Sequence, residues 1–279
     1  MVNERPHGIV SVKCCYPDRD RAVEYCVIIP DMKEIRLEGL NPVVSERLSP
    51  FIKEVLDGHD ENIHSMHIVG SSVTADFNEK TSDINSVVVL KKMDFGFIEF
   101  LAPLGKKYSK KKVAAPLILT PDYIRDSLDV FPIEFHDFRL IHRTVSGEDI
   151  FSDLMIDREH LRLQCERELK ARLVGIRQGC ISSLGEKERL AEMLLQSLRG
   201  VMPILRAVVF LYGAEPPVLR RETVTKFHEL TGIEVDVFIK ILALRDMTLK
   251  PSREEIMDIF RRYHEVLEQA GKIINEIQR

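Results

Sequence analysis

One stretch of the chain combines residue types that could together bind a phosphorylated ligand. In HIVGSSVTADFNEKTSDINSVVVL, an apolar run leads into Gly70, Ser71 and Ser72, and a second apolar run follows Asp83 and Asn85. A glycine lets the backbone approach a ligand closely, and serine hydroxyls with free backbone N–H groups are natural partners of phosphate. Carboxylate and amide oxygens suit Mg²⁺. This stretch therefore predicts a site for a nucleoside triphosphate with Mg²⁺, or with Mn²⁺ in its place.

The spacing of Asp83 and Asn85 predicts that their side chains act together. Side chains of a β-strand alternate between the two faces of the sheet, so residues two apart share a face. Asp83 and Asn85 should therefore point to one side while Ile84 turns into the core. A short polar loop would then carry the chain from the Gly-Ser turn to this strand.

These residues resemble the signature of the polymerase-beta type of nucleotidyltransferase superfamily. That signature is an apolar strand, Gly-Ser or Gly-Gly, a loop, and Asp-h-Asp or Asp-h-Glu, where h is apolar. Gly70, Ser71, the loop length and TSDI match it. The resemblance implies a third carboxylate on a later strand, for which Glu134 in FPIEF is the first choice and Asp137 the second. It also implies metal-dependent transfer of a nucleoside monophosphate to an acceptor that the sequence does not identify.

Asn85 stands where the superfamily has its second carboxylate. In the superfamily, two carboxylates bridge two metal ions that activate the attacking hydroxyl and stabilise the leaving oxygen. An amide supplies one neutral oxygen, and the lost charge could lower the rate roughly 10²- to 10⁴-fold or more. Two interpretations stay open. Either one metal ion held by Asp83, Asn85 and Glu134 supports catalysis, or the chain is a non-catalytic binding or regulatory protein on the same fold.

The elements expected around this segment alternate between strand and helix, which is typical of an α/β sheet. A β-hairpin is expected at about residues 8–40, and Thr120 followed by Pro121 predicts a capped helix start. The other expected strands are SMHIVGS, INSVVVLKK, AAPLILT and FPIEFHDFRLIH. The other expected helices are residues 43–57 and FGFIEFLAPLGKKYSKK. The second of these helices should be broken or kinked near Pro103.

Beyond Asp157 the pattern becomes helical. Ser252 and Glu255 form a capping-box pattern, and the apolar residues that follow recur at helical spacing. The sequence thus predicts a nucleotidyltransferase-like domain over residues 1–155 and a helical bundle over residues 156–279, a layout that resembles kanamycin nucleotidyltransferase. The long amphipathic last helix leaves a homodimer open.

Composition is ordinary for a globular protein, with 44% hydrophobic residues, 30% charged residues and a net charge of −4. The longest unbroken apolar runs are short, which predicts no membrane-spanning segment. The N-terminal MVNERPHGIV lacks an apolar signal region, and five cysteines without metal-binding spacing suit a reducing compartment. A cytoplasmic location is predicted.

Two further groups of residues have both an ordinary and a functional interpretation. The lysines of GKKYSKKK suit a solvated helix end, where cations complement the helix dipole, but would be the first place to look for a nucleic-acid contact. These are Lys106, Lys107, Lys110, Lys111 and Lys112. His59, His64 and His67 lie close in sequence without a regularly spaced carboxylate or cysteine, so a metal site is not expected there.

Overall fold

The computed structural model describes residues 9–13, 24–28, 34–183, 185–245 and 251–277. Its centre is a four-stranded mixed sheet in the order β5-β4-β3-β6. The strands are β3 (Ile63–Val69), β4 (Asn85–Leu90), β5 (Leu117–Leu119) and β6 (His142–Gly147). β3 pairs antiparallel with both β4 and β6, and β4 pairs parallel with β5.

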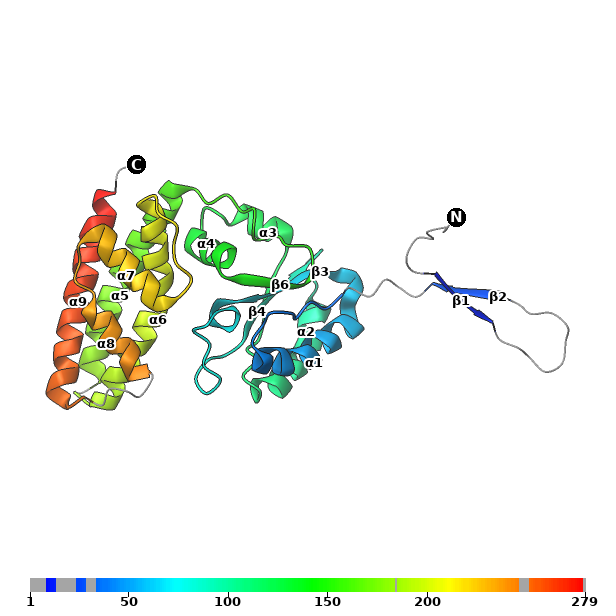
Figure 1. The fold of residues 1–279 in the computed structure, drawn as a ribbon, viewed down its shortest axis with the longest axis horizontal. Helices are drawn as coiled ribbons and strands as arrows, with labels where there is room; N and C mark the ends of the chain where they lie inside the picture. The colour runs from blue at the N-terminus through cyan, green and yellow to red at the C-terminus, as the bar shows by residue number, and fades with distance from the viewer. Residues whose placement is uncertain (1–8, 14–23, 29–33, 184, 246–250, 278–279) are drawn as a thin grey trace.

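The two faces of this sheet belong to different cores. On one face, Met66, Ile68 and Val88 pack against α1 (Pro42–His59) and α2 (Phe95–Ser109). On the other face, Val87 and Val89 join the core that continues through the helical part of the chain. Figure 1 shows α1 and α2 on one side of the sheet and the helical bundle beyond its other side. The sheet is therefore buried on both faces, which explains the near-continuous valine run of β4.

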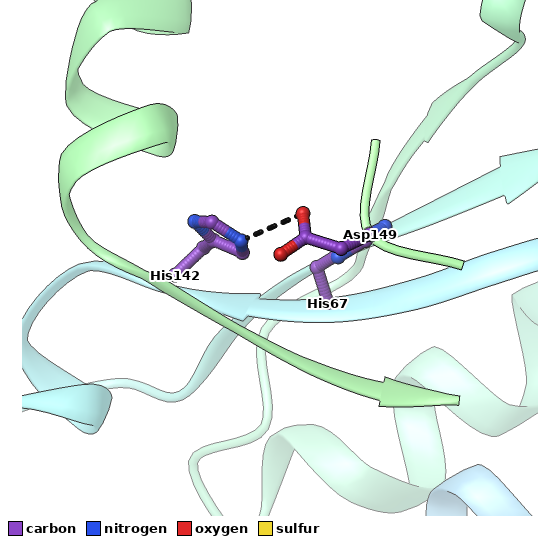
Figure 2. Close-up of side chains that lie close together, drawn as sticks. All are labelled: His67, His142 and Asp149. Carbon is purple, nitrogen blue, oxygen red and sulfur yellow. Dashed lines mark hydrogen bonds and ion pairs between the residues drawn. The ribbon is translucent and has the colours of Figure 1, made fainter. Parts of the chain in front are cut away.

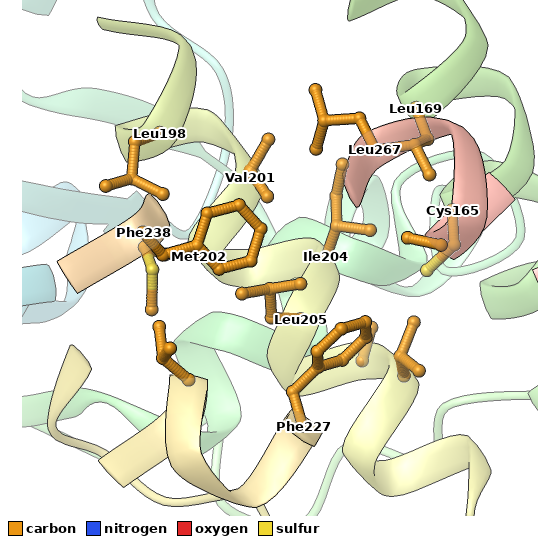
Figure 3. Close-up of a cluster of buried hydrophobic side chains, with 14 of the residues drawn as sticks. Cys165, Leu169, Leu198, Val201, Met202, Ile204, Leu205, Phe227, Phe238 and Leu267 are labelled. Atoms are coloured by element: carbon orange, nitrogen blue, oxygen red, sulfur yellow. The ribbon is translucent and has the colours of Figure 1, made fainter. Parts of the chain in front are cut away.

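The helical part follows β6 directly. It consists of α5 (Arg158–Ser182), α6 (Lys187–Leu211), α7 (Arg220–Thr231), α8 (Asp236–Arg245) and α9 (Arg253–Glu276). Helix α6 is central to the bundle, where Val201, Ile204 and Leu205 contact apolar side chains from the surrounding helices (Figure 3). By length and composition α6 could cross a membrane, but 67% of its most apolar stretch is buried inside the protein.

Several local predictions are confirmed. Thr120 caps α3 (Pro121–Asp126) by accepting a hydrogen bond from Tyr123 N, and Ser252 with Glu255 forms the capping box of α9. The hairpin strands are β1 (Ile9–Lys13) and β2 (Glu24–Ile28), while the turn expected between them lies outside the described residues. The apolar stripe of α9 is buried inside the chain's own bundle, and a homodimer stays a prediction.

One predicted strand is wrong. FPIEFHDFRLIH forms the helix α4 (Pro132–Leu140), and the strand β6 begins only at His142. Pro132 suits the first position of a helix. Pro132, Ile133, Phe135 and His136 are the buried residues, and their i, i+3 spacing is helical. Helix α2 also continues through Pro103, where a break or kink was predicted.

Candidate functional site

The turn after β3 takes a conformation that favours glycine. Gly70 has a φ of +72°, in the left-handed region, and begins a short 3₁₀ helix, η2 (Gly70–Val73). A Cβ added there would meet nothing within 4 Å, so Gly70 faces open space. Its N–H donates to Ile141 O at 3.2 Å, which ties the turn to the start of β6. Glycine is thus favoured by the backbone conformation and leaves the approach to the turn clear.

The two serines of the turn have different positions. Ser71 lines a pocket of about 240 Å³ together with Gly70. Ser72 is only 2% exposed, and its hydroxyl donates to Val69 O at 3.2 Å. Of the three residues predicted to contact phosphate, Gly70 and Ser71 therefore face the pocket, while Ser72 stabilises the turn from inside.

Asp83 and Asn85 lie at the start of β4 and line the same pocket. Both side chains are exposed, whereas Ile84 between them is fully buried. Hydrogen bonds from Ile84 N to Lys112 O and from Ala114 N to Ile84 O hold this end of the strand. The predicted alternation is confirmed, and the Gly-Ser turn meets the Asp83 and Asn85 side chains across one cavity.

The loop between the turn and β4 forms a wall of the pocket. The Asn78 side chain accepts hydrogen bonds from the N–H groups of Lys80 and Thr81, which fold the loop tip. Asp76 Oδ2 accepts the backbone N–H of Arg220 at 2.8 Å. Because Arg220 is the first residue of α7, this bond fastens the loop to the helical part of the chain, and the pocket lies between the two.

The structure separates Glu134 from the other predicted site residues. Glu134 lies on α4, outside the lining of the pocket, and its Oε2 accepts Gln164 Nε2 at 2.8 Å. The second choice, Asp137, does line the pocket, but it also comes from α4 and its Oδ1 lies 2.8 Å from Arg206 Nη1. The strand beside β4 carries Leu117, Ile118 and Leu119, so no carboxylate of β5 can join Asp83.

Three arginines complete the pocket: Arg199 and Arg206 from α6, and Arg220 from α7. Arg206 is paired with Asp137, as described above. Burial raises the pKa of Asp137, and the positive charge of Arg206 opposes that rise. Arg199 is exposed, and in the described part of the chain its guanidinium has neither a hydrogen bond nor an ion pair. Such a cation suits an anionic group.

The donor atoms of the pocket fit one hard cation better than two. Mg²⁺ takes oxygen ligands and keeps several waters, so one carboxylate from Asp83 and one amide oxygen from Asn85 form an adequate protein contribution. A pair of metal ions needs carboxylates whose two oxygens can each bind a different ion. Asp137 is engaged by Arg206 and Asp76 by the Arg220 N–H, which leaves Asp83 as the carboxylate best placed for a metal.

The predicted lysine cluster contacts the loop that borders this site. Lys110, Lys111 and Lys112 line a groove of about 340 Å³ with Glu46 and Arg47. The Lys112 ammonium donates to Lys80 O, within the loop that borders the pocket. Lys107, by contrast, is paired with Glu54. A nucleic-acid contact at these lysines stays a prediction.

The sequence alone did not identify the arginines or Asp76 as site residues. The arginines are far from Gly70 and Asp83 in the chain, and Asp76 belongs to no recognisable motif. Only the packing of α6 and α7 next to the sheet brings these residues together. Arg199 and Arg206 are seven residues apart on α6 and so share a helix face, but many charged helices contain such a pair.

No model of a known protein family matches this chain, and no curated protein matches it. A search of solved structures finds a spectinomycin adenyltransferase from Enterococcus faecialis, crystallised with ATP and spectinomycin. It is 13% identical, with a TM-score of 0.40, and the match covers 80% of this chain and 98% of that one.

Proposed function

We propose that this chain is a nucleotidyltransferase-like protein that binds a nucleoside triphosphate with Mg²⁺ in the pocket between the sheet and the helical bundle. The observation that supports it is the convergence of the Gly70–Ser71 turn with Asp83 and Asn85 in one cavity that also contains Arg199. The backbone of the turn would hold phosphate oxygens. Arg199 would neutralise phosphate charge, and Asp83 with Asn85 would hold the metal.

The reaction proposed for this site is transfer of a nucleoside monophosphate. A hydroxyl oxygen of the acceptor bonds to the α-phosphorus and its proton passes to solvent water. The bond from that phosphorus to the oxygen bridging to the β-phosphate breaks, and pyrophosphate leaves. Bound Mg²⁺ supplies charge stabilisation for the triphosphate. The chain's own contribution is to position the phosphates and to neutralise their charge, which carry most of the catalysis in this class of reaction.

A second candidate is a non-catalytic nucleotide-binding protein with the same pocket. It is favoured by Asn85, and by the absence of a carboxylate on β5 beside Asp83. Asp137, the carboxylate that could replace it, is bound to Arg206. Both candidates require nucleotide binding, and they differ in turnover.

The acceptor is the least defined part of the proposal. The groove lined by Lys110, Lys111 and Lys112 borders the loop that walls the pocket. A polyanionic acceptor such as a nucleic acid could lie in that groove with one end at the pocket. Its binding would weaken steeply as salt rises, because bound phosphates release counterions.

Thermal unfolding with each of the four ribonucleoside triphosphates, with and without Mg²⁺ or Mn²⁺, tests the shared requirement. A nucleotide at 100 times its dissociation constant should stabilise the folded state by about 2.7 kcal/mol. Asp83→Ala should remove the metal-dependent part of this shift. Asp129→Ala serves as the matched control, because Asp129 is an exposed carboxylate outside the pocket lining. The proposal fails if no nucleotide raises the melting temperature of the wild-type protein.

A further inference from the structure

A second cluster of polar side chains lies on the sheet outside the nucleotide pocket. His67 comes from the middle of β3, His142 from the first position of β6, and Asp149 from the loop that follows β6 (Figure 2). None of the three lines the pocket described above. His142 and Asp149 are 75 and 82 residues from His67 in the chain, so no sequence spacing could indicate the group.

The geometry of the cluster matches the size of a metal site. Each residue offers one ligand atom, and these atoms lie within 4.8 Å of one another. His142 Nε2 is 3.0 Å from Asp149 Oδ1. Zinc binds imidazole nitrogen and carboxylate oxygen at about 2.0 to 2.2 Å, so ligands of one ion lie up to about 4 Å apart. Side-chain movements of about an ångström would bring all three atoms to one ion.

His67 is held in one orientation at the inner side of the cluster. Its side chain is fully buried, and hydroxyl groups lie beside both of its ring nitrogens. One ring nitrogen contacts Ser65 Oγ at 2.8 Å and the other contacts Thr144 Oγ1 at 2.9 Å. An ion would replace one hydroxyl, and the other would keep the ring oriented, as the outer partners of metal-bound histidines do.

Asp149 is held as a fixed anion at the open side of the cluster. Its carboxylate accepts hydrogen bonds from Phe151 N at 3.0 Å and from the Ser152 hydroxyl at 2.6 Å. The Asp149 side chain is 40% exposed, which gives an ion a path from solvent.

An apolar wall closes the other side. The ring of Phe151 lies 4.6 Å from that of His67 and 5.5 Å from that of His142, measured between centroids. Phe138 packs on Phe151 at 5.3 Å. A wall of this kind excludes water and strengthens the attraction between a cation and a fixed carboxylate.

We propose that His67, His142 and Asp149 bind one divalent transition-metal ion of the zinc class, with water in the remaining position. Two imidazoles and one carboxylate suit such ions rather than Mg²⁺ or Ca²⁺, which take oxygen ligands. The site is independent of the proposed nucleotide site, although His142 follows Ile141, whose carbonyl anchors Gly70 N. An ion here would brace β3 and β6 beside the Gly70 turn.

Titration of the metal-free, full-length protein with Co²⁺ tests the proposal. We expect visible absorption typical of four-coordinate Co²⁺, saturation at one ion per chain, and loss of the signal when Zn²⁺ is added. His142→Gln and Asp149→Asn should each weaken Co²⁺ binding by at least about 10- to 100-fold, the range seen even for loss of outer-shell partners. His142→Gln keeps an N–H that can bond to Asp149, so this variant should remain folded.

His160→Ala is the matched control, because His160 is an exposed histidine 3.7 Å from Asp157 and outside the cluster. It should bind Co²⁺ as the wild type does. Two results would overturn the proposal. Equal affinity of wild type and His142→Gln would show that the three groups form only a hydrogen-bond network. Thiolate-to-Co²⁺ charge-transfer absorption would assign the bound ion to cysteines instead.

Discussion

Arg206 Nη1 lies 2.8 Å from Asp137 Oδ1, and this ion pair joins α6 to α4 in the lining of the pocket proposed for the nucleotide. The Arg206 and Asp137 side chains are only 7% and 19% exposed. Arg206 Nη2 also donates to Val218 O at 3.1 Å, so the same guanidinium holds the segment that leads into α7. The pair therefore fixes the position of three segments that line the pocket.

Arg206→Met should lower the free energy of unfolding by about 3 to 5 kcal/mol, because it leaves the Asp137 carboxylate buried without a partner. The double variant Arg206→Met with Asp137→Leu should recover much of that loss. Urea unfolding measures both. Arg177→Met is the control, because Arg177 and Glu268 are 51% and 45% exposed, and an exposed pair contributes at most about 1 kcal/mol. A double variant as unstable as the single one would contradict this account.

Local sequence signals predicted the parts of the fold whose causes are local. The Thr120 cap, the capping box at Ser252 and the alternation around Ile84 each depend on residues only a few positions apart, and all three are confirmed. A turn at Gly70 was predicted from the same kind of local signal, whereas its left-handed conformation was found only in the structure.

The errors come from features that depend on tertiary packing. The alternating apolar residues of FPIEF suited a strand, but burial against α5 and α6 selects a helix. The strand β6 was missed because its sequence, HRTVSG, has a single large apolar residue, Val145, and so shows no alternating pattern. The segment becomes a strand through its antiparallel pairing with β3. The arginines of the pocket were missed for the same reason, since the docking of distant helices decides which of many arginines line the pocket with Asp83.

Gly70→Ala should destabilise the protein by about 1 to 2 kcal/mol, because a Cβ makes the left-handed conformation unfavourable. No clash contributes, since the added atom would meet open space. Gly70→Asn should cost less, because asparagine tolerates this conformation. Gly175→Ala is the opposite control: Gly175 lies inside α5 with open space around it, and alanine there should stabilise by up to about 1 kcal/mol. Thermal unfolding distinguishes these outcomes, and a neutral Gly70→Ala would show that the turn adapts.

Acidification should weaken the fold through His136. This side chain is 1% exposed, and burial, followed by the charges of Arg139 and Arg206, lowers its pKa from 6.5 to about 4. Between these values the unfolded chain binds a proton that the folded chain excludes, so stability falls as the pH decreases. The loss expected from His136 alone is about 3 kcal/mol.

His136→Phe should reduce that pH dependence, because phenylalanine fits beside the Phe210 ring, 5.0 Å away, and does not titrate. Urea unfolding at pH 7, 6, 5 and 4 gives the slopes for both proteins. His160→Ala, at an exposed histidine, should leave the slope unchanged. Parallel slopes for wild type and His136→Phe would rule out His136 as the group responsible.

Arg199→Gln should weaken nucleotide binding without affecting stability. Because Arg199 is exposed and has no partner among the described residues, its removal leaves no buried group unsatisfied. Loss of one hydrogen bond to a charged phosphate costs about 1.5 to 3 kcal/mol, which corresponds to roughly a 10- to 100-fold higher dissociation constant. Isothermal titration with the nucleotide that gives the largest thermal shift measures this, and Arg261→Gln, at an exposed arginine of α9, is the control. An unchanged dissociation constant would place the triphosphate elsewhere.

Asn85→Asp distinguishes a weakened enzyme from a binding protein. The substitution adds a full negative charge beside Asp83 and gives the pocket the pair of carboxylates that two metal ions require. If the pocket retains the remaining groups for catalysis, the rate of Mg²⁺-dependent pyrophosphate release should rise by roughly 10²-fold or more, and Asp83→Asn should abolish it. Asn275→Asp provides the same charge change at an exposed position of α9, far from the pocket lining, and should have no effect. Tighter Mg²⁺-nucleotide binding by Asn85→Asp without turnover would instead favour the non-catalytic protein, because the missing carboxylate on β5 would then limit the chemistry.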